Sequence, residues 1–382
     1  MSQQTFRWDP YVLRSGEGAI ALLTEHFCSE RQSNILFILG KGFDIRMNQV
    51  LSQLTDIGCQ PSVDCMLISF NEGDTSVSHQ YKAYVDENMR ELNEIVPAEK
   101  FIHKSIQLWK QDGNKRRRVG DWEAAEIITD FSCIERYTDI IIDISALPRG
   151  IYFSLLGKIL SLIDTKPDGT PLINLIITVS ENARFDACVK EDGTDPDTKF
   201  LKGFGGQIKP GTERNEPLIW FPILGEEKDT HIRKAGDFLN ANEICPIFPF
   251  PSKDPRRADK LLVNYHGLLL DELRIEPQSI MYVPEQNPFE AYKALVRAIR
   301  NFQVSFRELN GCRAALSTFS SKLLSIGTFL AAYQINNVDR QNIVGVANVD
   351  SPGYILENEA TFADLKKESE LFVIWITGEP YE

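Results

Sequence analysis

The chain has 382 residues, 43% of them hydrophobic, which is long enough for a very large α/β domain or for two packed halves with buried cores. Its net charge of −13 and isoelectric point near 5.0 argue against general nucleic-acid binding and against an anionic membrane as partner, because both are polyanions. The basic run Lys115–Arg118 is a local exception. It follows Gln-Asp-Gly-Asn, which predicts a solvated surface turn.

The cysteines and the first residues indicate the compartment. The seven cysteines are scattered, odd in number and never spaced as Cys-x-x-Cys, which argues against disulfides and against structural zinc. The first ten residues contain no apolar leader core, and no apolar run reaches the about 18 residues of a membrane span. We therefore expect a reducing, cytoplasmic setting, no membrane contact and no metal site.

The first elements along the chain are a helix over 11–27 and an apolar strand that begins at Asn34. The strand stops at the turn Gly40-Lys41-Gly42, and a second helical pattern follows over 47–54. Glycine lacks a Cβ atom, so the backbone of this turn can bend sharply and approach a phosphate or a ribose. The turn predicts either a nucleotide-binding loop, in the place where α/β proteins bind such ligands, or a tight strand-to-helix turn that binds nothing.

Polar residues at the ends of the first two strands are candidate ligand contacts. Asp44 and Arg46 follow the glycine turn, and a second strand over 64–70 ends next to Glu72 and Asp74. In Rossmann-type proteins an acidic residue at the end of the second strand holds ribose hydroxyls. We therefore take Glu72 or Asp74 as the candidate ribose ligand.

A third strand, over 138–145, introduces a second loop with the chemistry of an anion site. It follows a polar and mostly helical stretch over 79–132 and leads into a helix over 151–163, whose first turn suits Pro148. A fourth strand follows over 172–179. The carboxyl end of the third strand carries three polar candidates: Asp143, Ser145 and Arg149.

The segment 186–216 is rich in Gly, Asp, Lys, Thr and Pro, and we expect an irregular connection between two halves there. Further strands are predicted over 218–224, 245–251, 279–283, 312–317, 343–347 and 371–377. The alternation of strand, loop and helix predicts an α/β fold with mainly parallel sheets, built from Rossmann-like halves over 1–185 and 217–382 whose strand-end loops face a shared crevice. The same order of elements over 143–179 and 316–347 is a weak sign of internal duplication.

The junction over 317–327 is the second candidate for phosphate binding. Ser320, Ser321 and Lys322 stand between a strand and the N-terminus of a helix, which offers backbone N–H groups, hydroxyl donors and a positive charge. The alternative is an ordinary helix cap by one of the two serines. No Walker loop, nucleophile elbow or clustered His-Cys set occurs in the sequence, and His231, in a charged loop, is the histidine with the most charged neighbours.

Two short stretches resemble known families. Residues 39–46 are similar to the Leu-Gly-Ala-Gly-x-Asp-x-Arg motif of leucine carboxyl methyltransferases, which implies S-adenosylmethionine, although Lys41 replaces a small residue of that motif. Residues 320–322 resemble the Gly-Gly-Thr-Lys loop of CARF-type Rossmann domains, without its two glycines. This second resemblance implies a cyclic oligonucleotide ligand and a role in prokaryotic antiviral defence.

These patterns predict that the protein binds a nucleotide or another phosphate-bearing small molecule at the strand ends, as a sensor or regulator. In this hypothesis Gly40 and Gly42 allow close approach, Asp44 binds hydroxyls, and Arg149 and Lys322 neutralise phosphate. One alternative is an S-adenosylmethionine-dependent transferase or a nucleotide-cleaving enzyme that uses the same glycine loop. Another is a non-catalytic subunit whose acidic surface docks on a partner protein.

Overall fold

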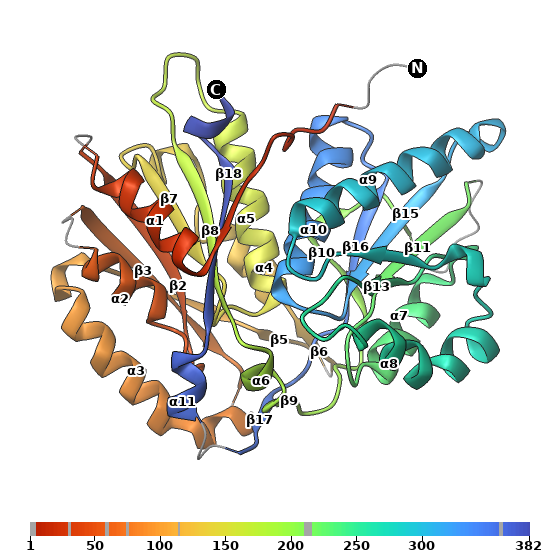
Figure 1. Ribbon diagram of the computed structural model, residues 1–382, viewed down its shortest axis with the longest axis horizontal. Helices are drawn as coiled ribbons and strands as arrows, with labels where there is room; N and C mark the ends of the chain where they lie inside the picture. Colours follow the sequence, from red (N-terminus) through yellow and green to blue (C-terminus); the bar gives the residue numbers. More distant parts are fainter. Residues whose placement is uncertain are drawn as a thin grey trace. The chain divides into compact units, whose positions relative to one another are not determined.

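The structure is a computed structural model, and it describes residues 5–29, 32–57, 61–73, 76–113, 115–209, 216–358 and 362–382. The chain divides into two compact units. We call Pro10–Gly193 with Ser351–Glu382 the flanking unit, and Met1–Asp9 with Thr194–Asp350 the middle unit. Each unit is an α/β fold with its own sheet and helices, so the expected fold class is confirmed (Figure 1).

A seven-stranded sheet forms the centre of the flanking unit. Its strands are β1 (Val12–Ser15), β2 (Asn34–Lys41), β3 (Ser62–Asn71), β4 (Phe101–Gln107), β7 (Asp139–Asp143), β8 (Asn174–Glu181) and β18 (Glu370–Thr377). They lie in the order β1-β18-β8-β7-β2-β3-β4, and β18 is antiparallel to both of its neighbours. The other five run parallel in the 3-2-1-4-5 order of a doubly wound sheet, which reverses between β2 and β7.

Helices cover both faces of this sheet (Figure 1). They are α1 (Gly16–Phe27), α2 (Gln49–Asp56) and α3 (Lys82–Ile95) on one face, and α4 (Gly120–Glu126) and α5 (Arg149–Asp164) on the other. Along β2, Ile35, Phe37 and Leu39 join the core formed with α1, α2 and α3, while Leu36 and Ile38 alternate onto the opposite face. All five side chains are buried, which explains why this parallel strand is apolar without a polar alternation.

The middle unit repeats this topology. Its strands are β10 (Lys199–Gly205), β11 (Leu218–Ile223), β12 (Glu243–Ile244), β13 (Ile247–Pro249), β14 (Met281–Val283), β15 (Arg313–Thr318) and β16 (Val344–Asn348). They lie in the order β10-β16-β15-β11-β13-β14, with β12 beside β11 and β10 antiparallel to β16. The main parallel strands again follow the 3-2-1-4-5 order, which here reverses between β11 and β15.

The helices of the middle unit also lie on two faces of the sheet (Figure 1). They are α7 (Asp229–Leu239) and α8 (Arg257–Asn264) on one face, and α9 (Pro288–Ser305) and α10 (Lys322–Tyr333) on the other. The order β7–α5–β8 in the flanking unit has its counterpart in β15–α10–β16. The two similar stretches of sequence therefore occupy the same positions in two sheets that have the same strand order.

The division of the chain differs from the expected one at both ends of the second half. Strand β10 lies inside the segment expected to be irregular and pairs with β16 of the middle unit. Strand β18, expected in the second half, pairs with β8 of the flanking unit over residues 370–377. An apolar pattern predicts that a strand is buried, but it does not predict which sheet edge the strand joins. The sheet edge depends on contacts between segments that are distant in sequence.

Three local expectations also require correction. The stretch predicted to be mostly helical contains β4 and the hairpin of β5 (Trp109–Asp112) and β6 (Lys115–Arg118), so the basic run is a strand rather than a turn. The helix expected from residue 11 begins only after β1. Cys28 is disulfide-bonded, contrary to expectation, and the remaining unassigned cysteine, Cys59, lies outside the described residues. Cys28 Sγ lies 3.9 Å from the Ile57 carbonyl oxygen, so the ends of α1 and α2 meet, which spacing along the chain could not reveal.

The smaller elements of the flanking unit lie beyond the carboxyl ends of its strands. They are α6 (Ala183–Asp186), α11 (Phe362–Lys367), β9 (Val189–Glu191) and β17 (Tyr354–Leu356), and the two strands pair antiparallel. Within the described ranges, no helix is long and apolar enough to cross a membrane.

Candidate functional site

The residues singled out in the sequence lie at the carboxyl ends of parallel strands. Gly40 and Lys41 are the last residues of β2, and Asp143 is the last of β7. Arg149 and Lys322 are the first residues of α5 and α10, which follow β7 and β15. Each group thus lies where the strand order of its own sheet reverses, the place where open α/β sheets bind ligands.

The two glycines of the first loop differ in their surroundings. A Cβ atom on Gly40 would lie 2.9 Å from side-chain atoms of Leu147 and Phe70 and 3.0 Å from the Ala146 carbonyl oxygen. A Cβ atom on Gly42 would meet nothing within 4 Å. Close packing of the protein itself therefore accounts for Gly40, whereas the backbone at Gly42 is accessible.

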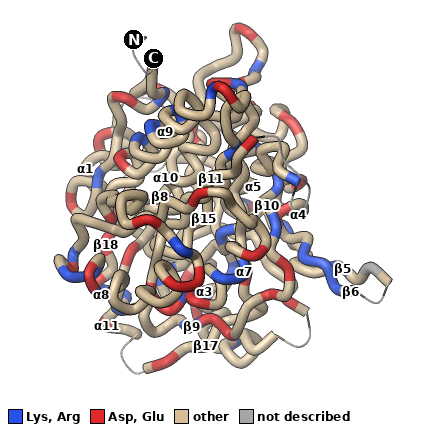
Figure 2. Tube along the Cα trace, turned by 90° about the vertical axis from the view of Figure 1, so that its right-hand side faces the viewer, with Lys and Arg blue, Asp and Glu red and all other residues tan. Residues whose placement is uncertain are grey.

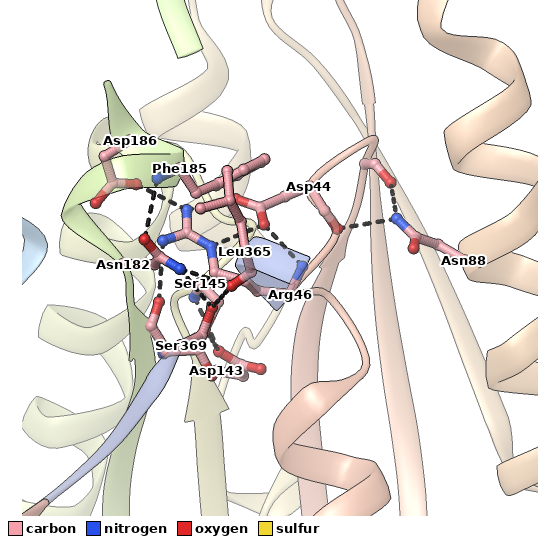
Figure 3. Close-up of polar contacts among 12 residues, drawn as sticks. Asp44, Arg46, Asn88, Asp143, Ser145, Asn182, Phe185, Asp186, Leu365 and Ser369 are labelled. Atoms are coloured by element: carbon pink, nitrogen blue, oxygen red, sulfur yellow. Dashed lines mark hydrogen bonds and ion pairs between the residues drawn. The ribbon is translucent and has the colours of Figure 1, made fainter. Parts of the chain in front are cut away.

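Asp44 and Arg46 bind each other in a buried clamp between two strand ends (Figure 3). Arg46 Nε and Nη2 donate to the two oxygens of Asp44 at 2.9 and 2.8 Å, and Nη2 also lies 2.9 Å from Asp186 Oδ1, in α6. Nη1 donates to the Ser180 carbonyl oxygen at 3.1 Å, and the guanidinium lies 4.7 Å from the Phe185 ring centroid. This clamp joins the loop after β2 to the loop after β8.

Burial shapes the charge of this clamp. Only 3% of Arg46 is exposed. Burial favours the neutral guanidine, but the charges of Asp186 and Asp44 outweigh it and raise the pKa of Arg46 above its ordinary value. Arg46 is thus a fixed cation inside the protein, and its Asp44 partner is already occupied by two charged hydrogen bonds.

The loop after β2 is further held by Asn88 and by aromatic packing. Asn88 Nδ2 donates to the carbonyl oxygens of Gly42 and Asp44 at 2.9 Å each (Figure 3). The Phe43 ring centroid lies 5.3 Å from that of Tyr81 and 6.4 Å from that of Tyr354. These contacts anchor the loop to α3 and to the segments that carry Tyr81 and Tyr354.

The polar residues at the end of β7 also serve the fold. Asp143 Oδ1 accepts hydrogen bonds from the Ser145 backbone N–H at 2.8 Å and from Ser145 Oγ at 2.5 Å. Ser145 Oγ in turn accepts from the Ser180 backbone N–H at 2.9 Å. Both side chains are buried, so they join the ends of β7 and β8 (Figure 3).

The remaining candidates of the flanking unit lie apart from that network. Glu72 accepts a hydrogen bond from Ser76 Oγ and, through its carbonyl oxygen, one from Arg116 Nη2 at 2.8 Å. Lys41 and Arg149 are half-buried. Asp74 lies outside the described residues.

In the middle unit, two backbone segments come into contact at the switch point, the place where the strand order of the sheet reverses. A Cβ atom on Gly225, in the loop after β11, would lie 2.1 Å from the Phe319 carbonyl oxygen, in the loop after β15. Tyr265 closes the same loop, since its hydroxyl donates to the Gly225 carbonyl oxygen at 2.6 Å and accepts from the Lys228 backbone N–H at 2.8 Å. Burial, together with the nearby acidic groups, raises the pKa of Tyr265 to about 12, so the phenol keeps its proton.

Arg257 connects four strand-end loops of the middle unit. It begins α8, after β13, and donates from Nε and Nη2 to the two carboxylate oxygens of Glu226 at 2.7 Å each. Nη1 donates to Glu285 Oε1 at 2.5 Å, and Nη2 lies 3.4 Å from Ser320 Oγ. Glu226, Glu285 and Ser320 follow β11, β14 and β15, respectively.

The two carboxylates on Arg257 differ in exposure. The side chains of Arg257 and Glu285 are 14% and 16% exposed, whereas that of Glu226 is 55% exposed. Burial alone would raise the pKa of Glu226, but the hydrogen bonds and charge of Arg257 outweigh it and lower the pKa below its ordinary value. Glu285 is therefore the inner, fixed partner of the guanidinium, and Glu226 is an ionised outer partner next to solvent.

The predicted serine and lysine junction borders this arginine. Ser321 caps α10, because its hydroxyl accepts a hydrogen bond from the Leu324 backbone N–H at 3.3 Å. Ser320, Ser321 and Lys322 are all half-buried. The junction thus combines a helix cap with a cation and a serine hydroxyl that faces Arg257.

Two buried polar groups lie at neighbouring strand ends of the same sheet. Thr318 ends β15 and Asn348 ends β16, and they are 3% and 4% exposed. Among the described residues, neither Thr318 Oγ1 nor Asn348 Nδ2 has a hydrogen-bond partner. A buried polar group without a partner costs about 1–3 kcal/mol, and few such groups occur in a folded protein.

Sequence patterns identified the serines and the lysine of this site but missed Arg257, Glu226 and Glu285 as a cluster. Glu226 and Arg257 are 31 residues apart, and Arg257 and Glu285 are 28 apart. The only available signal was that each follows a strand, which makes their meeting at one edge a consequence of topology. His231 is buried in α7.

The comparisons with known proteins show no family for this chain. No protein-family model matches the sequence, and no curated protein matches it. A solved structure described as a universal stress protein from Pseudomonas aeruginosa UCBPP-PA14 is 13% identical, with 88% of this chain and 97% of that chain covered and a TM-score of 0.21. The UDP-GlcNAc 2-epimerase of Methanocaldococcus jannaschii is 10% identical, with coverages of 87% and 92% and a TM-score of 0.21. At these TM-scores the likeness carries no argument about function.

Proposed function

We propose that the protein binds a phosphate-bearing small molecule, such as a nucleotide, at the carboxyl ends of β11 and β15 in the middle unit. The observation that carries this proposal is the bidentate contact between Arg257 and Glu226. A guanidinium offers phosphate the same pair of parallel donors that it offers a carboxylate. A phosphate can therefore take the place of the exposed Glu226 carboxylate, while Glu285 keeps the guanidinium in position.

The junction after β15 supports the same location. The N-terminus of a helix attracts anions through its backbone N–H groups and its dipole, and α10 is 12 residues long. Lys322 adds a cation at its first position, and Ser320 adds a hydroxyl near Arg257. Thr318 and Asn348 offer two further buried polar groups for the rest of the ligand.

Binding without a recognisable catalytic pair favours a sensor or regulator, the role that the resemblance to CARF-type domains also implies. A second candidate is an enzyme that binds S-adenosylmethionine or a nucleotide at the loop after β2. The accessible backbone of Gly42 favours it, while the occupied Asp44 and the buried Arg46 weigh against it.

The test is calorimetric titration with ATP, NAD, S-adenosylmethionine and cyclic oligonucleotides against the wild type and two arginine variants. Arg257→Ala should weaken binding of the phosphate-bearing ligands about tenfold to a hundredfold, the scale of about 1.5–3 kcal/mol for charged hydrogen bonds. Arg233→Ala is the matched control, because Arg233 makes the same bidentate contact with Glu272, at 2.7 and 2.8 Å, from the middle of α7. Equal affinities for the two variants, or no binding by any member of the panel, would overturn the proposal.

A further inference from the structure

The hairpin β5–β6 concentrates positive charge in a strongly acidic protein. Five of its ten residues are cations and one is an acid, in a chain whose net charge is −13. The cations are Lys110, Lys115, Arg116, Arg117 and Arg118. Figure 2 shows blue positions on both strands of the hairpin, which extends away from the neighbouring trace.

The register of the hairpin places like charges opposite each other. Lys110 is paired directly with Arg117, and both side chains are exposed. Within the part of the chain that the structure describes, neither side chain contacts an acidic group. Like charges directly across two antiparallel strands destabilise the pair, so an anion bound between them would relieve the repulsion.

The other face of the hairpin is organised by Trp109. The guanidinium of Arg116 lies 4.4 Å from the Trp109 ring centroid, and that of Arg118 lies 5.2 Å from it. Arg116 also donates to the Glu72 carbonyl oxygen at 2.8 Å, and Arg118 donates to the Ser351 carbonyl oxygen at 3.0 Å. These contacts hold two cations on one face while Lys110 and Arg117 occupy the opposite face, because side chains alternate along a strand.

From this arrangement we propose that the β5–β6 hairpin binds duplex nucleic acid through its phosphates. A two-stranded ribbon fits the major groove, and strands of four residues span about 13 Å against a groove about 8.5 Å deep. The exposed Lys110 and Arg117 then meet the phosphates, while Arg116 and Arg118 hold the ribbon against the Glu72 and Ser351 carbonyl oxygens. A single-strand binder would instead present an open aromatic ring for base stacking, whereas Trp109 is covered by two guanidinium groups.

The acidic character of the whole chain does not prevent this contact. Charges are screened over about 8 Å at physiological ionic strength, which is less than the length of the ribbon. The cations of the hairpin therefore dominate the electrostatic potential at its exposed surface. Since the contacts are to phosphates, binding should be independent of base sequence.

The test is fluorescence anisotropy with a labelled 20-base-pair duplex of arbitrary sequence, the corresponding single strand, and vesicles that contain phosphatidylserine. We expect duplex binding at 50 mM salt, and a loss of about 40- to 150-fold in affinity at 200 mM if three or four phosphates are contacted. The double variant Lys110→Glu/Arg117→Glu should abolish binding. The double variant Arg307→Glu/Lys367→Glu, which changes two exposed cations elsewhere and alters the net charge equally, should bind as the wild type does.

The outcomes separate the alternatives. Thermal unfolding checks that both double variants are folded, and Lys110→Gln/Arg117→Gln provides a milder version if charge reversal disturbs the hairpin. If the hairpin variant and the control variant lost the same affinity for the duplex, the net charge of the protein would explain the effect, and the proposal would be overturned. Tighter binding of the single strand, binding of vesicles alone, or no binding at 50 mM salt would overturn it as well.

Discussion

Arg46 Nη2 lies 2.9 Å from Asp186 Oδ1, so a buried cation joins the carboxyl ends of the first and last parallel strands of the flanking sheet, β2 and β8. The same guanidinium binds both oxygens of Asp44. The Gly-x-Gly-x-Asp-x-Arg stretch, which as a sequence predicts ligand contacts, therefore uses its two charged members to fix the loop. This assignment and that of Arg257 can be tested separately.

Removing the Arg46 clamp should destabilise the protein. Arg46→Ala should lower the free energy of unfolding by about 2–4 kcal/mol, somewhat less than the about 3–5 kcal/mol of a fully buried pair, because Asp44 and Asp186 can still reach water. Urea denaturation, followed through the unfolding transition of the flanking unit, provides the measurement. Arg184→Ala is the control, since Arg184 pairs with Glu368 at an exposed position and should cost less than about 1 kcal/mol. A comparable loss for both variants would contradict a buried clamp.

Neutralising Glu226 should tighten ligand binding. Glu226→Gln keeps the shape of the side chain but removes the negative charge that competes with a phosphate for Arg257. The affinity for phosphate-bearing ligands should rise about two- to fivefold, the scale of a partly exposed ion pair. Glu272→Gln, which alters the matched pair with Arg233, should leave the affinity unchanged. A weaker affinity of Glu226→Gln would indicate that Glu226 itself contacts the ligand.

The glycines of the two switch points should respond differently to alanine. Gly225→Ala places a Cβ atom 2.1 Å from a backbone oxygen, which side-chain rotation cannot relieve, and should cost about 2–3 kcal/mol of unfolding free energy. Gly42→Ala meets nothing within 4 Å and does not require a positive φ, so it should be neutral or stabilising by up to about 1 kcal/mol. Chemical denaturation of both variants distinguishes these signs.

A substitution at Gly42 also shows which of the two candidate sites holds the ligand. Gly42→Val fills the accessible space beside the loop after β2, so it should abolish binding if that loop holds the ligand. A ligand bound at Arg257 should be unaffected. Titration of the same ligand into Gly42→Val and Arg257→Ala therefore assigns the binding site.

A buried carboxylate in the flanking unit should make stability depend on pH. Burial would raise the pKa of Asp139, but hydrogen bonds from His26 at 2.7 Å, Thr138 at 2.5 Å and Asn174 at 2.8 Å outweigh it and hold the pKa below its ordinary value. Since the folded-state pKa is lower than the unfolded value of about 3.9, the stabilisation is complete well above about pH 4 and is lost as the pH falls through the folded-state pKa.

Asp139→Asn should remove this dependence. The difference in unfolding free energy between wild type and variant should be constant from about pH 7 to 5 and shrink below about pH 4. Urea denaturation across this range measures it. A difference that stays constant down to about pH 3 would contradict a lowered pKa of Asp139.

The sequence by itself determined the class of fold and the position of most strands. Apolar runs such as those beginning at Asn34 and over 172–179 predicted buried strands, and their alternation with helices predicted mainly parallel sheets, because parallel strands are covered by helices on two sides. It also located the polar residues at strand ends, since parallel strands direct their carboxyl ends to one edge.

Only the tertiary structure decided which of those residues bind one another. Asp44, Arg46, Asp143 and Ser145 form hydrogen bonds within the flanking unit, whereas Arg257 meets glutamates that lie about 30 residues away on either side. It also assigned β18 to the sheet of the flanking unit and made the basic run part of a hairpin. The sheet that a strand joins and the partner that a charged side chain binds both depend on contacts between segments that are distant in sequence. Local hydrophobic periodicity does not specify these partners, because a buried strand can be covered equally well at any sheet edge.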